Sequence, residues 1–392
     1  MFLTNLTPGL KSALAFRTKL LEALKAEPEW LFGEIDDQKV VWIPSVLGTE
    51  FVANPSGPEV PLYGVLTVRT RLLKTTDFGR ASDYVNLLNN YTSMTRWVIS
   101  QVSGSEEPEF EMSSELTFVV GNEFTDITLD AAVLAVSEQI AKAAAICSEE
   151  FYGGWGEPLL ISGPDGIRYQ EKWNEIVDFF NSTVLPAGSQ PADALFEAAV
   201  KAFDEEVQFQ LGNDYPAWFG NHDSETLVFE VPFDDAEFFS GVIASIQPIN
   251  GERYRTSLAT VQSIENPHLG KGVLTFLKIP AEPLGDLQLS TVNELNLHGS
   301  GEGAGCSHGI GAWVLNGGEL KYGLFIPVSW LAQFTESTLI QMFRVIFENL
   351  ARVSWAVKMV LQGNQGHNAN FFGLAASEER ARGPHFGELG LG

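Results

Sequence analysis

Apolar residues recur with helical spacing in two long stretches, one in each half of the chain. The later stretch steps by four, three, four and three residues along Leu339, Phe343, Ile346, Leu350 and Val353. At the same offsets, the earlier stretch carries Leu129, Val133, Val136, Ile140 and Ala143. Such spacing gathers apolar side chains on one face of an α-helix. The pattern therefore predicts two equivalent helices, each with one buried stripe.

Further landmarks follow in the same order in both halves. The stretch Gly64-Val65-Leu66-Thr67 reappears as Gly272-Val273-Leu274-Thr275. A Leu-Asn pair ends a predicted short helix at Asn89 and again at Asn296, and predicted strands begin at Trp97 and Trp313. The separations stay close to half of the 392 residues. Ordered matches at this distance indicate a tandem duplication, because solenoid repeats are far shorter.

Each half reads as a helix, several strands, a short helix, two strands and a long helix. Strands and helices are grouped without strict alternation, which favours an α+β fold with an antiparallel sheet packed by helices on one face. We predict a first copy over 1–150, a connecting segment with a helix over 151–190, a second copy over 191–361 and a flexible tail over 362–392. Asn316-Gly317-Gly318, between two apolar runs, predicts a tight hairpin.

The charge balance narrows the choice of partners. The chain has 50 acidic and 24 basic residues, and its net charge of −26 repels phosphate backbones and anionic membranes. The nearest approach to a basic cluster is Arg69, Arg71 and Lys74, which we interpret as the solvated face of one strand. No segment is long and apolar enough to span a bilayer. We expect neither a nucleic-acid partner nor a membrane partner.

The cysteines and the first residues indicate the compartment. Cys147 and Cys306 are too few for a disulfide framework and fit a reducing environment. The start of the sequence lacks the basic stretch and apolar core of a secretory signal. We therefore expect a cytoplasmic protein.

The sharpest chemical candidate is the glycine-rich stretch from His298 to His308. Cys306 between the two histidines could supply an activated thiolate or metal ligands. However, Asn296 to Trp313 spans 17 positions, against 8 from Asn89 to Trp97, so the stretch is an elaboration of an ordinary connection. A flexible surface loop is our leading interpretation. We predict no metal site and no cofactor, and keep His298, Cys306 and His308 as binding candidates.

Two further pairs recur between the halves. Trp97 and Trp313 are most simply core aromatics, and the alternative is a pair of aromatic anchors lining a binding groove. Glu138 and Glu348 invite a catalytic interpretation, but helical geometry turns them away from the buried stripe and towards solvent. We find no convergent catalytic set and predict a protein that is not an enzyme.

These landmarks resemble the YbjN-type proteins of bacteria, which share the type III secretion chaperone-like fold. The resemblance is carried by the Gly-Val-Leu-Thr strand, the helix ends at Leu88-Asn89 and Leu295-Asn296, the aromatic-led hairpin, and the closing helix after Thr-Leu. It implies an α+β sandwich and a binding or regulatory role, with no catalytic residues. Because secretion chaperones of this fold pair as dimers, it also implies that the two copies form a pseudo-dimer within a monomer.

The leading functional hypothesis is a chaperone-like protein that binds another protein or a peptide. The acidic surface would steer a basic partner towards it. Two alternatives stay open. One is a small-ligand sensor with a pocket between the two copies, and the other is a hydrolase or transferase that uses the loop with His298, Cys306 and His308.

Overall fold

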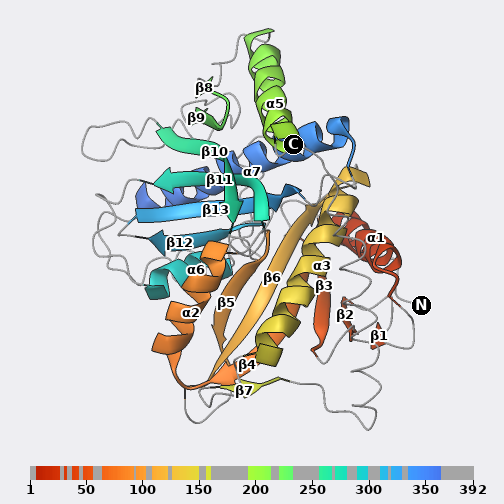
Figure 1. The fold of residues 1–392 in the computed structure, drawn as a ribbon. Coiled ribbons are helices and arrows are strands. Elements are labelled where there is room, and N and C mark those ends of the chain that lie inside the picture. The colour runs from red at the N-terminus through yellow and green to blue at the C-terminus, as the bar shows by residue number, and fades with distance from the viewer. Residues whose placement is uncertain are drawn as a thin grey trace. The chain divides into compact units, whose positions relative to one another are not determined.

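The chain forms two compact α+β units (Figure 1). The first comprises Met1–Ala187 with His308–Ala312, and the second comprises Gly188–Ser307 with Trp313–Gly392. The computed structural model describes the following residues: 6–26, 31–32, 38–43, 47–55, 64–91, 94–102, 108–121, 126–149, 156–159, 193–212, 220–232, 256–266, 270–279, 289–298, 310–316, 319–328 and 334–362.

The first unit contains a seven-stranded sheet. Its strands follow the order β1-β2-β3-β4-β6-β5, and β7 pairs with β4. All of these pairs are antiparallel. The elements in chain order are α1 (Pro8–Ala23), β1 (Leu31–Phe32), β2 (Lys39–Trp42), β3 (Thr49–Pro55), β4 (Gly64–Thr75), α2 (Phe78–Tyr91), β5 (Arg96–Gln101), β6 (Phe110–Val120), α3 (Asp126–Glu149) and β7 (Glu157–Pro158).

The second unit contains a six-stranded sheet in the order β8-β9-β10-β11-β13-β12. Apart from β7, this is the strand order of the first sheet, which is compatible with the predicted two-copy arrangement. The α+β class with antiparallel sheets is confirmed. The elements are α5 (Asp193–Gly212), β8 (Gly220–His222), β9 (Thr226–Pro232), β10 (Thr256–Asn266), β11 (Gly270–Ile279), α6 (Leu289–His298), β12 (Ala312–Asn316), β13 (Glu319–Pro327) and α7 (Glu336–Gln362).

Helices cover one face of the first sheet. α1 and α3 pack across β3, β4 and β6, and α2 packs against β5 and β6. α1 starts at Pro8, because Thr7 caps it by accepting the Leu10 N–H and Pro8 supplies the fixed φ of a first helical turn. Asp77 caps α2 in the same way, by accepting the Arg80 N–H. Local capping chemistry thus sets where the covering helices begin.

The predicted stripe on the closing helices is buried. In α7, Leu339, Phe343, Ile346 and Leu350 are all buried, while the side chain of Val353 lies outside the described residues. In α3, Val136, Ile140 and Ala143 are buried, and Leu129 and Val133 are half-buried. The helical periodicity therefore identified the face that packs against the sheet.

The matching Gly-Val-Leu-Thr stretches are not structurally equivalent. A Cβ on Gly64 would meet Gly9 and Ala13 of α1, so Gly64 lies on the helix-covered face of its sheet. A Cβ on Gly272 would instead meet Phe325 and the carbonyl of Ile326. The alignment that equates these two glycines is therefore wrong at this strand.

The true correspondence is shifted by one residue. Leu277 of β11 pairs with Tyr322, whose hydroxyl accepts a hydrogen bond from Asn349 of α7. Val273, Thr275 and Leu277, all fully buried, therefore face the helix, and Leu66 corresponds to Val273. Because side chains alternate along a strand, this shift of one residue inverts the faces.

The sequence analysis did not predict two central strands, β3 and β10. β3 alternates buried and half-buried residues from Thr49 to Asn54, but the turn formers after Pro55 obscured this pattern. Of the tail predicted over 362–392, everything after 362 lies outside the described residues, and so does 160–190 of the predicted connecting segment. Within the predicted connecting segment, Glu157–Pro158 joins the first sheet as β7.

The contact between Gly64 and α1 gives a stability prediction. In Gly64→Ala, the new Cβ would lie 2.1 Å from the carbonyl oxygen of Gly9. We expect a loss of about 3 kcal/mol in the free energy of unfolding, because backbone on both sides must move. The control is Gly323→Ala, where the nearest atoms are at an ordinary 3.5 Å. Equal stability of the two variants in urea unfolding would contradict the close approach.

Candidate functional site

A buried asparagine closes the edge of the first sheet. Asn89, near the end of α2, accepts a hydrogen bond from the Trp97 N–H at 2.7 Å and donates one to the Trp97 carbonyl at 3.0 Å. β5 ends the strand order, so these two backbone groups point away from β6. The asparagine side chain therefore takes the place of a further strand along the first residues of β5.

The second unit repeats this contact. Asn296 of α6 accepts from the Trp313 N–H at 2.8 Å and donates to the Trp313 carbonyl at 2.9 Å. β12, like β5, ends its strand order. We call each arrangement an asparagine clasp, meaning Asn89 with Trp97 or Asn296 with Trp313. Both clasps use the Leu-Asn and Trp positions that the sequence singled out.

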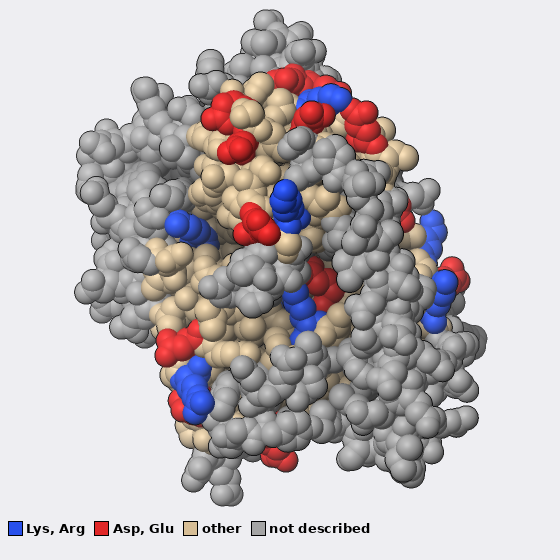
Figure 2. All heavy atoms as spheres, viewed as in Figure 1, with Lys and Arg blue, Asp and Glu red and all other residues tan. Residues whose placement is uncertain are grey.

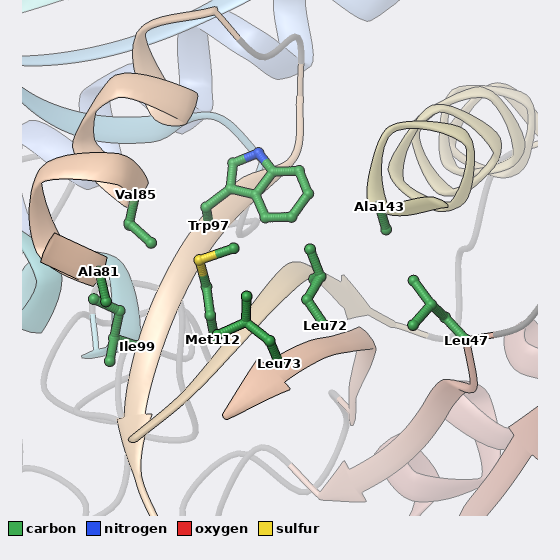
Figure 3. Close-up of a cluster of buried hydrophobic side chains, with 9 residues drawn as sticks. All are labelled: Leu47, Leu72, Leu73, Ala81, Val85, Trp97, Ile99, Met112 and Ala143. Atoms are coloured by element: carbon green, nitrogen blue, oxygen red, sulfur yellow. The ribbon is translucent and has the colours of Figure 1, made fainter. Parts of the chain in front are cut away.

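Both tryptophans lie in the core. The exposed fractions of Trp97 and Trp313 are 0% and 2%, so neither presents a surface to a partner in the structure described. Figure 3 shows Trp97 between Ala81 and Val85 of α2 on one side and Ala143 of α3 on the other. This burial fits the core interpretation of the two aromatics and leaves no groove lined by them.

The other predicted binding residues lie largely outside the described chain. His298 is the last residue of α6, and its side chain lies outside the described residues, as do Cys306 and His308. The chain is described again from Ile310. Gly311, with φ of 81°, donates its N–H to the carbonyl of Met94 at 2.5 Å, and it belongs to the first unit. The structure therefore fixes where this connection ends and does not group the three candidates.

Each closing helix also inserts a buried amide into its sheet. Gln139 of α3 donates to the carbonyls of Val68 and Ser114, and Asn349 of α7 donates to the Tyr322 hydroxyl at 3.3 Å. Tyr322 packs on Trp313 with ring centroids 5.1 Å apart, whereas Ser114 stands opposite Trp97. The same position thus carries a large aromatic in one unit and a small residue in the other.

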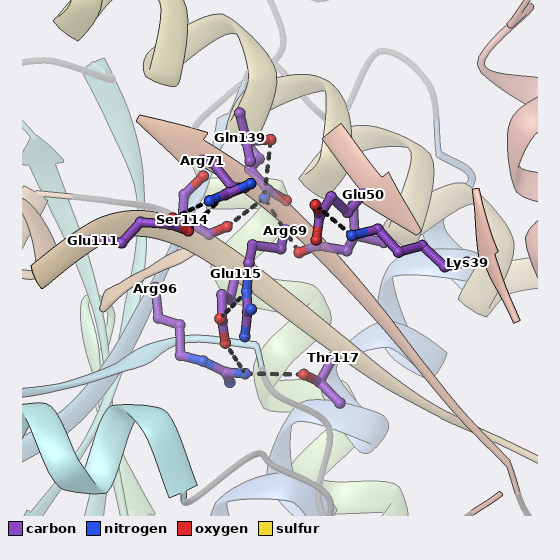
Figure 4. Close-up of polar contacts among 12 residues, drawn as sticks. Lys39, Glu50, Arg69, Arg71, Arg96, Glu111, Ser114, Glu115, Thr117 and Gln139 are labelled. Carbon is purple, nitrogen blue, oxygen red and sulfur yellow. Dashed lines mark hydrogen bonds and ion pairs between the residues drawn. The ribbon is translucent and has the colours of Figure 1, made fainter. Parts of the chain in front are cut away.

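Charged side chains cover the opposite face of the first sheet, and their sign alternates from strand to strand (Figure 4). Positive residues stand on β2, β4 and β5, and negative residues stand on β3 and β6. We call this set the charge ladder. Its members on the five strands are Lys39, Glu50, Arg69, Arg71, Lys74, Glu111, Glu115 and Arg96, with Glu109 just before β6.

The pairs in the charge ladder are specific. Arg71 forms a two-point contact with Glu111, and these hydrogen bonds raise the pKa of its guanidinium above its ordinary value. Glu115 accepts from Arg69 at 2.5 Å and lies 3.7 Å from Arg96. Arg96 also donates to Thr117 at 2.9 Å. Arg69, Arg71 and Lys74 thus lie on a partly solvated face of β4, as predicted, but each is paired with a glutamate.

Burial varies across the charge ladder. Arg96 and Glu115 are 3% exposed, whereas the side chains of Arg69 and Arg71 are 37% and 43% exposed.

Glu138 of α3 was also expected to be solvated, but its side chain is only 12% exposed and pairs with Lys142 at 2.6 Å. The side chain of Glu348 lies outside the described residues. Carboxylates here act as partners of cations.

The described charges and backbone edges suit binding, through ionic contacts and main-chain hydrogen bonds. Figure 2 shows basic and acidic side chains interspersed on the face it draws, with acidic ones gathered towards α5, where Glu197, Asp204 and Glu205 are exposed. In the described part of the chain, no group of three or more His, Cys, Asp or Glu residues is placed to hold a metal ion. None of the described helices is long and apolar enough to cross a membrane.

Comparison with protein-family models, with characterised proteins and with solved structures finds no match to this chain.

The asparagine clasp gives a matched pair of variants. Asn89→Ala leaves two buried backbone groups of Trp97 without partners, so we expect a loss of about 2–4 kcal/mol in the free energy of unfolding. Asn90→Ala removes only an exposed bond to the Asn86 carbonyl and should cost less than about 1 kcal/mol. Denaturant unfolding measures both. Similar losses would show that the clasp is not a stabilising contact.

The charge ladder gives a second matched pair of variants. Glu115→Gln keeps the shape of the side chain but leaves buried Arg96 without its counter-charge, so we expect a loss of about 3 kcal/mol. Glu336→Gln, in an exposed pair with Lys201, should change stability little because solvent screens that pair. The two unfolding curves decide. If Glu115→Gln is as stable as Glu336→Gln, the buried pair of Glu115 and Arg96 does not stabilise the fold.

Proposed function

We propose that this chain is a non-enzymatic, chaperone-like binding protein that engages a protein or peptide partner with a basic surface. The observation that carries the proposal is the distribution of charge. Among the described residues, basic side chains are held in ion pairs with glutamates at Lys39, Arg69, Arg71, Lys74, Arg96, Lys142, Lys201 and Arg344. Each of these pairs also uses a glutamate, so the pairing leaves the net charge of the chain at −26.

An acidic surface of this kind acts on association in two ways. It speeds the encounter with a basic partner and repels acidic competitors and nucleic acids. The glutamates of the charge ladder form ion pairs with arginine and lysine, so they are not placed to act as general acids or bases. Binding, rather than proton transfer, is therefore the function that the described charges support best.

The two-unit architecture supports the same proposal. Both units have the same strand order and the same asparagine clasp, as expected of tandem copies of one domain. We propose that this domain is of the type III secretion chaperone-like kind found in YbjN-type proteins, that the two copies act as a pseudo-dimer within a monomer, and that the protein works in the cytoplasm.

The proposal predicts a salt-sensitive protein complex. The purified full-length chain, immobilised and exposed to lysate at low ionic strength, should retain a basic protein, and the complex should re-form from the two purified proteins. Raising salt to about 1 M should weaken it by at least tenfold, because the screening length falls to about 3 Å. Calorimetry at two salt concentrations measures the change.

Native mass spectrometry of the same preparation supplies the control. We expect the mass of a monomer, without a bound small molecule. A stoichiometric small molecule, together with no retained protein, would overturn the proposal in favour of a small-ligand sensor. A complex that is indifferent to salt would overturn the role of the acidic surface.

A further inference from the structure

The longest strand of the first sheet extends past its neighbour. β4 is 12 residues long, and β3 pairs with it only as far as Thr70. The pairing of β4 with β6 then shifts register between Arg71 and Leu73, which marks a β-bulge. Bulges commonly end the pairing of a strand with its neighbour. The stretch from Arg71 to Thr75, here called distal β4, therefore offers an edge on the side that β3 has left.

A short segment of the same chain lies on this edge. β7 pairs antiparallel with distal β4, with Pro158 opposite Leu73 and Glu157 opposite Lys74. The N–H of Leu159 donates to the carbonyl of Leu72 at 2.7 Å. In the described part of the chain, β7 is the strand that pairs with distal β4 on this side. The edge is thus covered by a segment that follows α3 and is not part of the repeated pattern of the two units.

The fit of β7 depends on one glycine. A Cβ on Gly156 would lie 2.9 Å from Cδ1 of Leu73 and 3.1 Å from the carbonyl oxygen of Lys74. Leu73 is fully buried in the core, so it has little freedom to move aside. Any larger residue at this position would push the segment away from distal β4, which makes Gly156 the natural place to release it.

β7 is also a weak element by its length. It has two residues, one of them a proline, which has no N–H to donate. Main-chain hydrogen bonds contribute modestly to net stability, and a strand this short makes few of them. Glu157 is exposed, and Lys74 already pairs with Glu109 on the other side. Recognition on this edge is therefore by main chain and not by charge.

We propose that distal β4 is a strand-acceptor site for an extended peptide segment of the protein partner, and that β7 is the chain's own occupant of that site. The inference rests on the proposed binding function and assigns it a location. An incoming peptide would pair antiparallel with Leu73 and Lys74, with a glycine where it passes Leu73. Strand addition of this kind takes its affinity from main-chain hydrogen bonds.

The test uses a labelled peptide with the sequence of residues 154–160, GWGEPLL, and the full-length chain. In the unchanged protein, the tethered segment competes at an effective concentration in the millimolar range. Gly156→Val releases that segment and should bind the peptide about tenfold or more tightly by fluorescence anisotropy. Gly79→Val, where a Cβ would meet only Asp77 at 3.7 Å, is the matched control and should behave like the unchanged protein.

Several results would overturn the site. These are no binding of the peptide to folded Gly156→Val, equal binding to both variants, or equal binding of a scrambled peptide. Hydrogen exchange of the unchanged protein gives an independent check that needs no variant. The Leu159 amide should exchange much faster than β4 amides paired with β6, and equal protection would mean that β7 does not open.

Failure of the site and failure of the proposed function are distinguishable. If a salt-sensitive protein partner binds but is unaffected by excess GWGEPLL peptide and by Gly156→Val, distal β4 is not the site and the binding function stands. If no protein partner binds, yet Gly156→Val takes up the peptide as expected, the strand-acceptor site stands and the proposed function fails.

Discussion

The asparagine clasp is the contact on which the rest of each unit depends. It ties the end of the short helix to the second residue of the edge strand through both backbone groups of a tryptophan. A buried N–H or C=O without a partner is costly, and an edge strand offers a row of them. One asparagine satisfies two such groups and, by holding the backbone of Trp97 or Trp313, keeps the indole in the core.

This arrangement explains why the connection between helix and strand can vary so much. From Asn89 to Trp97 the chain takes 8 positions, and from Asn296 to Trp313 it takes 17. Both connections end in the same pair of hydrogen bonds, since the clasp is made by side chain and backbone at the two ends and not by the residues between them. Loop closure entropy grows slowly with length, so the longer connection is tolerated.

The two units differ on the face of the sheet that lies away from the clasped core. In the first unit this face carries the charge ladder, with Arg69 opposite Glu115. At the corresponding place in the second unit, Phe276 stands opposite Gly323. The ion pair of the first unit thus has an apolar counterpart at this place in the second unit. The acidic surplus and the charge ladder together describe a protein that pairs some of its cations with glutamates and keeps a large negative net charge.

Sequence reasoning identified the class, the order of elements and the two positions of the clasp, because helical periodicity and the Asn and Trp landmarks are local signals. It failed where the register of strand pairing decides which residues correspond. The repeated Gly-Val-Leu-Thr suggested an equivalence that the sheet contradicts by one residue, and only the partners of Gly64 and Gly272 show this. The charge ladder was also out of reach, since Arg71 and Glu111 are 40 residues apart and meet only through the pairing of β4 with β6.

Hydrogen exchange at the tryptophan amides shows whether the asparagine clasps hold the two edge strands. Among the nine tryptophans of the chain, the amides of Trp97 and Trp313 should be among the slowest to exchange, because each is donated to a buried asparagine. Asn89→Ala should speed exchange at Trp97 and leave Trp313 unchanged. Rapid exchange at both amides in the unchanged protein, or slow exchange at Trp97 without Asn89, would contradict the account.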